Sequence, residues 1–109
     1  MGDRANINFV ERDGGELYFY THWHGTELPK ILARALDRGR DRWTDESYLA
    51  RIIFSEMIKE EIEDTTGFGI STYRGDYEYS DLVVNCADLD VRDREGNVLM
   101  FDEFIEEYK

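Results

Sequence analysis

Tyrosine and histidine alternate along one short segment, and side chains of these types can bind a ligand or a metal ion. The four residues are Tyr18, Tyr20, His22 and His24. In a regular strand they share one face, where two imidazoles can hold a divalent metal ion, although a catalytic centre needs a third ligand. The chain has no further histidine, so Cys86 or an aspartate would have to supply it.

These four residues support two interpretations. In the first, they are an aromatic sheet face packed beneath helices, with hydrogen-bonded histidines, and the protein has no catalytic residue, metal or cofactor. In the alternative, the same face makes the chain a small-molecule-binding or metal-binding protein, or an enzyme. The first interpretation is the leading one, because the spacing of two histidines alone is weak evidence for a metal.

Two further candidate sites lack the surroundings that their chemistry needs. Gly67 and Gly69 lie in a segment rich in Thr and Ser, but a phosphate-binding glycine loop leads into a helix, and this one precedes a predicted strand. We expect Gly67 to stop a helix and Gly69 to allow close packing. Cys86 has acidic and no basic neighbours, which disfavours a thiolate nucleophile.

Carboxylates are the remaining candidates. The formal net charge is −12, and residues 56–109 hold 16 acids against 5 bases. Such a field repels nucleic acid and favours encounters with basic partners. If the acids share one face, they present a charge pattern like that of a nucleic-acid backbone, suited to a basic groove. The predicted partner-binding residues are Glu56, Glu60, Glu61, Glu63, Asp64, Asp76, Glu78, Asp81, Asp88, Asp90, Glu103, Glu106 and Glu107.

Hydrophobic periodicity predicts the elements that position these side chains. Alternation over 4–10 and 16–23, around a Gly-containing turn, predicts a hairpin. Helical spacing predicts a helix from Thr26 to Gly39 and a second from Thr44 or Asp45 to about Glu63, with Ile62 in its buried stripe. Strands are expected over 68–73, 77–86 with a continuation over 89–92, and 98–101, followed by a terminal helix capped by Asp102.

The resulting order, ββααβββα, predicts one α+β domain over residues 1–109. Its sheet is expected to be mainly antiparallel, with the two consecutive helices packed on it and a short helix at the C-terminal end. The continuous apolar run at 82–84 indicates a central strand. The second helix has a broad apolar arc, including Phe54 and Ile58, that could pack on a partner or form a homodimer.

Composition excludes several classes of protein. Hydrophobic residues make up 41% and aromatic residues 14% of the chain, too much for a disordered acidic tail. There is no apolar run of about 18 residues, as a membrane span would need. We expect no signal peptide and, from the single cysteine, no disulfide framework. These features favour the cytoplasm of a bacterial host.

Four segments carry a resemblance to known proteins. They are GDRANI (2–7), YTHWHG (20–25), DESYLARIIFSEMI (45–58) and TGFGIST (66–72). Together they resemble a family of small bacteriophage and bacterial proteins to which no activity, cofactor or catalytic residue is attached. The resemblance implies a phage or prophage origin, and by analogy an inhibitor of host or defence machinery.

These observations lead to one expected function. The chain is expected to be a non-enzymatic acidic protein that binds a basic, nucleic-acid-binding partner, such as a CRISPR effector, as an inhibitor. Direct binding to nucleic acid is not expected, because the whole-protein field opposes it and the basic residues around 34–42 are interrupted by acids.

Overall fold

The computed structural model describes residues 2–109, which form six strands and three α-helices. The elements, in chain order, are β1 (Ala5–Val10), β2 (Glu16–Thr21), α1 (Leu28–Arg38), a 3-10 turn (Arg40–Arg42), α2 (Glu46–Ile58), β3 (Phe68–Ser71), β4 (Leu82–Asn85), β5 (Asp90–Arg92), β6 (Val98–Met100) and α3 (Phe101–Tyr108).

All six strands belong to one sheet, in the order β3-β2-β1-β4-β5-β6. The β1–β4 pair is parallel and the other four pairs are antiparallel. The predicted α+β class and the central position of 82–84 are therefore confirmed. One strand was missed, because the chain turns over residues 86–89, where Leu89 has φ 56°, and β5 folds back antiparallel to β4 instead of continuing it.

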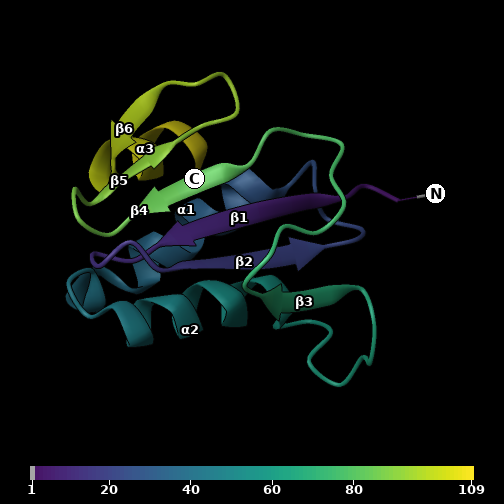
Figure 1. Ribbon diagram of the computed structural model, residues 1–109. Helices are drawn as coiled ribbons and strands as arrows, with labels where there is room; N and C mark the ends of the chain where they lie inside the picture. Colours follow the sequence, from purple (N-terminus) through teal and green to yellow (C-terminus); the bar gives the residue numbers. More distant parts are fainter. Residues whose placement is uncertain (1) are drawn as a thin grey trace.

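The three helices lie on the same side of the sheet, as Figure 1 shows. Alternation along β1 and β2 directs one set of side chains toward them, so that Ile7 stands opposite Phe19 and both are buried. Helix α1 contributes Leu32 and Leu36 to this core and packs against both α2 and α3. The helix layer thus places α2 near the β3 edge and α3 near the β6 edge (Figure 1).

The other face of the sheet is crossed by the connection between β3 and β4, residues 72–81 (Figure 1). The buried side chain of Asn6 holds this connection: its Nδ2 donates to the carbonyl oxygens of Gly75 and Asp76, and its Oδ1 accepts from the N–H of Gly75. Residues 77–81 were predicted as strand, but they are used for this crossing. Strand β4 begins only at Leu82.

The N-terminal residues are fixed to the fold. Asp3 accepts hydrogen bonds from the Tyr79 hydroxyl at 2.6 Å and from the N–H of Thr26 at 2.9 Å. A carboxylate is thus placed at the start of α1, where the helix dipole favours negative charge. Two of the segments that carry the family resemblance, around Asp3 and Gly25, therefore meet at one end of the sheet, where Gly25 donates to the carbonyl of Asp3.

The second helix is shorter than predicted. It ends at Ile58, and Ile62 is 71% exposed, so the expectation that Ile62 lies in the buried stripe was wrong. The physical reason is charge: four acids follow within six residues, where the negative end of the helix dipole disfavours them. The last helix also begins two positions earlier than predicted, because its N-cap is Met100 instead of Asp102.

Candidate functional site

The alternating tyrosines and histidines do not form one face. Strand β2 ends at Thr21, so only Tyr18 and Tyr20 follow its alternation. They pair with Asn8 and Asn6 on the face opposite the helices. The expectation of an aromatic face packed beneath helices was therefore wrong for these tyrosines. Tyr20 is instead covered by the crossing connection, with Gly75 against its ring.

The two histidines serve separate contacts. The Tyr20 hydroxyl and His22 Nδ1 are hydrogen-bonded at 2.9 Å. His24 lies on the helix side, where its Nε2 is 3.0 Å from Glu61 Oε1 and its ring stacks on Phe68. Among residues 2–109, no group of three or more His, Cys, Asp or Glu side chains is arranged to hold a metal ion.

The glycine pair and the cysteine also have structural surroundings. Gly67 has φ +96°, and a Cβ there would stand 2.0 Å from the Trp23 ring, so this glycine is required by its backbone and by Trp23. It does not stop α2, which ends nine residues earlier at Ile58. A Cβ placed at Gly69 would have no neighbouring atom within 4 Å, so the predicted close packing there was wrong. Burial raises the pKa of the Cys86 thiol to about 12, which keeps it protonated at neutral pH.

Apart from Glu56, which lies within α2, the acids predicted to bind a partner are distributed over four places. They follow α2, lie on the connection that crosses the sheet, lie at the β4–β5 turn, and line the outer side of α3. The crossing connection and α3 lie on opposite faces of the sheet (Figure 1), so these acids do not all share the single face that imitation of a nucleic-acid backbone by all of them would need. The residues in these four places are 60–64, 76–81, 88–90 and 102–107.

Several of the predicted partner-binding acids are engaged in ion pairs. Glu56 is buried between Arg38, at 3.1 Å, and Lys59, at 2.7 Å. Burial works to raise the pKa of Glu56, but these two cations outweigh it and lower the pKa below its ordinary value. Other pairs join Arg4 to Glu78 and Arg74 to Asp81. These carboxylates support the fold and are poorly placed for a partner.

Helix α3 carries acids of a different kind. Glu103, Glu106 and Glu107 are exposed, and no basic residue between positions 2 and 109 forms an ion pair with them. Positions i, i+3 and i+4 are neighbours on a helix surface, so the three charges lie close together and repel one another. We call these three residues the α3 acidic face.

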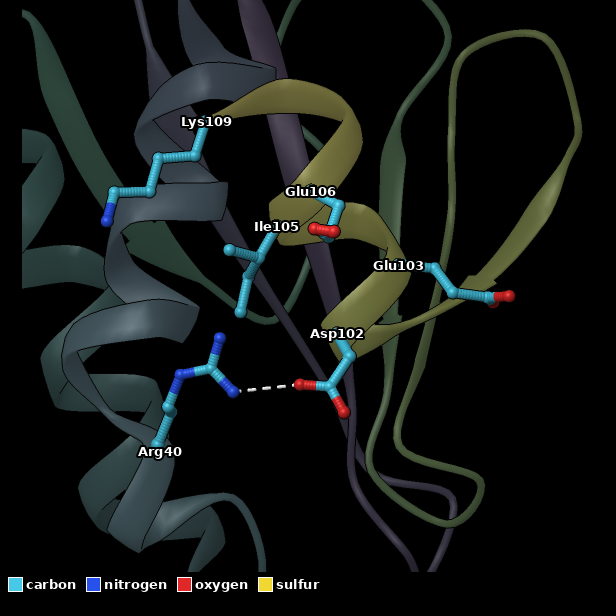
Figure 2. A pocket seen from close by; sticks show the side chains of 6 residues that line it. All are labelled: Arg40, Asp102, Glu103, Ile105, Glu106 and Lys109. Atoms are coloured by element: carbon cyan, nitrogen blue, oxygen red, sulfur yellow. Dashed lines mark hydrogen bonds and ion pairs between the residues drawn. The ribbon is translucent and has the colours of Figure 1, made fainter.

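Two hollows flank the α3 acidic face. The larger, of about 730 Å³, lies between α3 and the 3-10 turn that follows α1, and Figure 2 shows its lining side chains. There Asp102 points toward Arg40, with an ion pair of 2.8 Å, while Glu103 points away from it (Figure 2). The smaller, of about 400 Å³, lies on the β6 side; both hollows share Glu103 and Glu106.

The helix that carries this face is held firmly in place. Phe101, Phe104 and Ile105 are buried in the core. At its C-terminal end the Tyr108 hydroxyl donates to Asp93 at 3.0 Å, and Lys109 pairs with Asp37. The three glutamates are therefore displayed on a rigid support, as specific recognition requires.

Sequence reasoning named the three glutamates but missed their neighbours. Arg40 and Asp102 are separated by 62 positions, and no local pattern indicates that they meet. An apolar groove between α2 and β3 was also missed, although the broad apolar arc of the second helix was its sequence signal.

Comparisons with protein-family models, with curated proteins and with solved structures found no match. The resemblance to small phage and bacterial proteins therefore stays a prediction. No helix among residues 2–109 has both the length and the apolar character needed to cross a membrane.

Proposed function

We propose that this protein is a non-enzymatic binding protein whose α3 acidic face recognises a basic surface of another protein. The observation that carries the proposal is the presence of three exposed glutamates without an ion-pair partner on one rigid helix. Arg and Lys side chains of a partner would supply the missing cations, and the flanking hollows give them room to approach.

The position of two of these charges, those of Glu106 and Glu107, has no benefit for the helix itself. Glu106 and Glu107 lie in the last turn of α3, which holds no basic residue. Acidic groups at the C-terminal end of a helix oppose its dipole, and like charges at neighbouring helix positions add repulsion. A cationic partner would relieve both effects, and the dipole would add to its attraction.

Inhibition is the consequence that we propose for such binding. Basic surfaces on proteins commonly contact nucleic-acid phosphates. Occupation of that surface by the α3 acidic face would exclude the nucleic acid, as expected for an inhibitor of a defence nuclease or a CRISPR effector. The phage origin and the bacterial host belong to this proposal.

Affinity capture from a bacterial lysate with three baits tests the binding function. The baits are the unchanged protein, the variant E103Q/E106Q/E107Q and the control E60Q/E63Q/D64N, which removes the same charge from exposed residues after α2. We expect a basic nucleic-acid-binding protein with the first and third baits, released as salt rises, and its loss with the second. The affinity for the purified partner should fall by about tenfold.

Two results would contradict the proposal. Capture of the same proteins by all three baits would show that the α3 acidic face is dispensable. A partner lost only with the E60Q/E63Q/D64N control would move the interface to the end of α2. If a partner binds as expected, competition with DNA for that partner tests inhibition separately from binding.

A further inference from the structure

Strand β3 forms an unprotected edge of the sheet. It pairs with β2 on one side, and no strand of the described chain pairs with its other side. Natural edge strands are usually kept short, or are blocked by charged residues, proline or a bulge. Strand β3 is short, but its four residues, Phe68–Ser71, include no charge, proline or bulge, and Ile70 is 52% exposed. The outer backbone groups of β3 are therefore open to pairing.

An apolar groove of about 290 Å³ lies beside this edge, on the helix side of the sheet. The groove forms because some apolar side chains of α2 are not fully covered by the core. Phe54 and Ile58 are only half-buried. The Phe54 ring reaches the Phe19 ring, with centroids 5.8 Å apart. The complete lining is Leu17, Phe19, Ala50, Arg51, Phe54, Ser55, Ile58 and Ile70.

We infer that β3 and this groove together bind an extended segment of a partner protein as an added strand. Ile70 stands opposite Phe19 in the β2–β3 register and points toward the same face. A strand added to β3 continues this row, so its alternate side chains point to the helix side. Main-chain hydrogen bonds would then give affinity, and apolar side chains seated in the groove would give specificity.

The acidic charge beside β3 indicates which kind of partner binds this edge. The segment that leads from α2 into β3 carries Glu60, Glu63 and Asp64 without ion-pair partners, and its one base, Lys59, is paired with Glu56. A second copy of the chain carries the same net charge of −12 and would be repelled. The occupant is therefore a strand of another protein that has apolar residues at alternate positions and Lys or Arg at its ends.

This site is separate from the α3 acidic face. Strand β3 and α3 lie at opposite edges of the sheet (Figure 1). A substitution at one site therefore leaves the other unchanged, and each proposal can fail alone.

A synthetic peptide tests the inference without knowledge of the natural partner. The probe alternates valine and threonine and has two lysines at each end; a second probe has proline in place of its central residue. Binding is measured by calorimetry, and the site by amide chemical shifts, for the unchanged protein, for Ile70→Lys and for Val98→Lys. Val98 is the matched control, because it is 59% exposed on β6, the opposite edge.

The expected result is binding of the first probe with shifts in residues 68–71, weakened about tenfold or more by Ile70→Lys and unchanged by Val98→Lys. The proline probe should not bind, since it cannot complete the hydrogen-bond ladder. If Ile70→Lys does not fold, Ile70→Thr keeps the β-branch, removes most of the apolar contact and should weaken binding less.

Four results would overturn the inference. They are equal binding by Ile70→Lys, equal binding of the proline probe, a dimer of the unchanged protein that Ile70→Lys dissociates, and binding of decanoate in the groove without binding of the peptide. The dimer would show that the edge pairs with a second copy of the chain, and the decanoate result would show that the groove binds a carboxylate with an apolar chain. In the capture experiment, the comparison of the unchanged protein with E103Q/E106Q/E107Q is unaffected by any of them, whereas the E60Q/E63Q/D64N bait removes acids beside β3 and therefore also reports on this edge.

Discussion

At the scale of single residues, Glu56 shows how the same residue type can serve the fold in one place and recognition in another. Its carboxylate is buried between Arg38 and Lys59, whereas Glu60, four positions further on and beyond the end of α2, is exposed. Removal of a buried charge leaves its partners unpaired, whereas removal of an exposed one changes little. Predictions about individual acids therefore depend on where each carboxylate lies.

We expect Glu56→Gln to lower the free energy of unfolding by about 2 kcal/mol, because Arg38 and Lys59 lose their anion. Urea unfolding measures this change, and Glu60→Gln should stay within about 0.5 kcal/mol of the unchanged protein. Since the pKa of Glu56 is lowered on folding, its contribution is complete above its ordinary value of 4.5 and is lost as pH falls through the folded value. The difference between the two proteins should therefore shrink in acid; a constant difference would contradict the pairing.

Gly67 and Gly69 make a second pair of contrasting residues. Gly67→Ala should destabilise the protein by about 2 kcal/mol or more, because φ is positive and the new Cβ would meet Trp23. Gly69→Ala should change stability little, since the space around it is open. Thermal unfolding of both variants tests this, and equal effects would contradict the roles given to the positive φ and to the Trp23 contact.

At the scale of elements, α3 has acidic residues at both ends, which stabilise the helix at its N-terminal end and destabilise it at its C-terminal end. Asp102 and Glu103 lie in its first turn, and Glu103 accepts from the N–H of Met100 at 2.8 Å. Glu106 and Glu107 lie near the opposite end. We expect E106Q/E107Q to raise the free energy of unfolding by a few tenths of a kcal/mol at low salt, and less at high salt. Asp102→Asn, which also removes the Arg40 ion pair, should lower it; a loss of stability in E106Q/E107Q would mean that these glutamates support the fold.

Local elements could be predicted from sequence, whereas distant contacts could not. The alternation in 4–10 and the turn at Gly14 and Gly15 encode the β1–β2 hairpin within a few residues, and the hairpin was found. The parallel β1–β4 pair joins Ile7 to Leu82, and no local pattern encodes such a contact. The alternation in 18–24 gave a wrong site because it does not show where β2 ends.

At the scale of the whole molecule, the sheet and helices divide the acidic charge among separate surfaces. Helix α3 and the end of α2 lie near opposite edges of the sheet (Figure 1). A net charge of −12 sets the long-range attraction for a basic partner. The surface that a basic partner binds is therefore decided by which carboxylates form no ion pair within the chain and lie on a rigid element.

One titration tests this choice most directly. An arginine-rich peptide is added to the isotope-labelled protein, and backbone amide shifts are followed by NMR at low and at high salt. We expect the largest shifts in residues 99–109, with a strong decrease at high salt because exposed charges are screened. Largest shifts in residues 59–66, or shifts that salt leaves unchanged, would contradict recognition of a basic partner by the α3 acidic face.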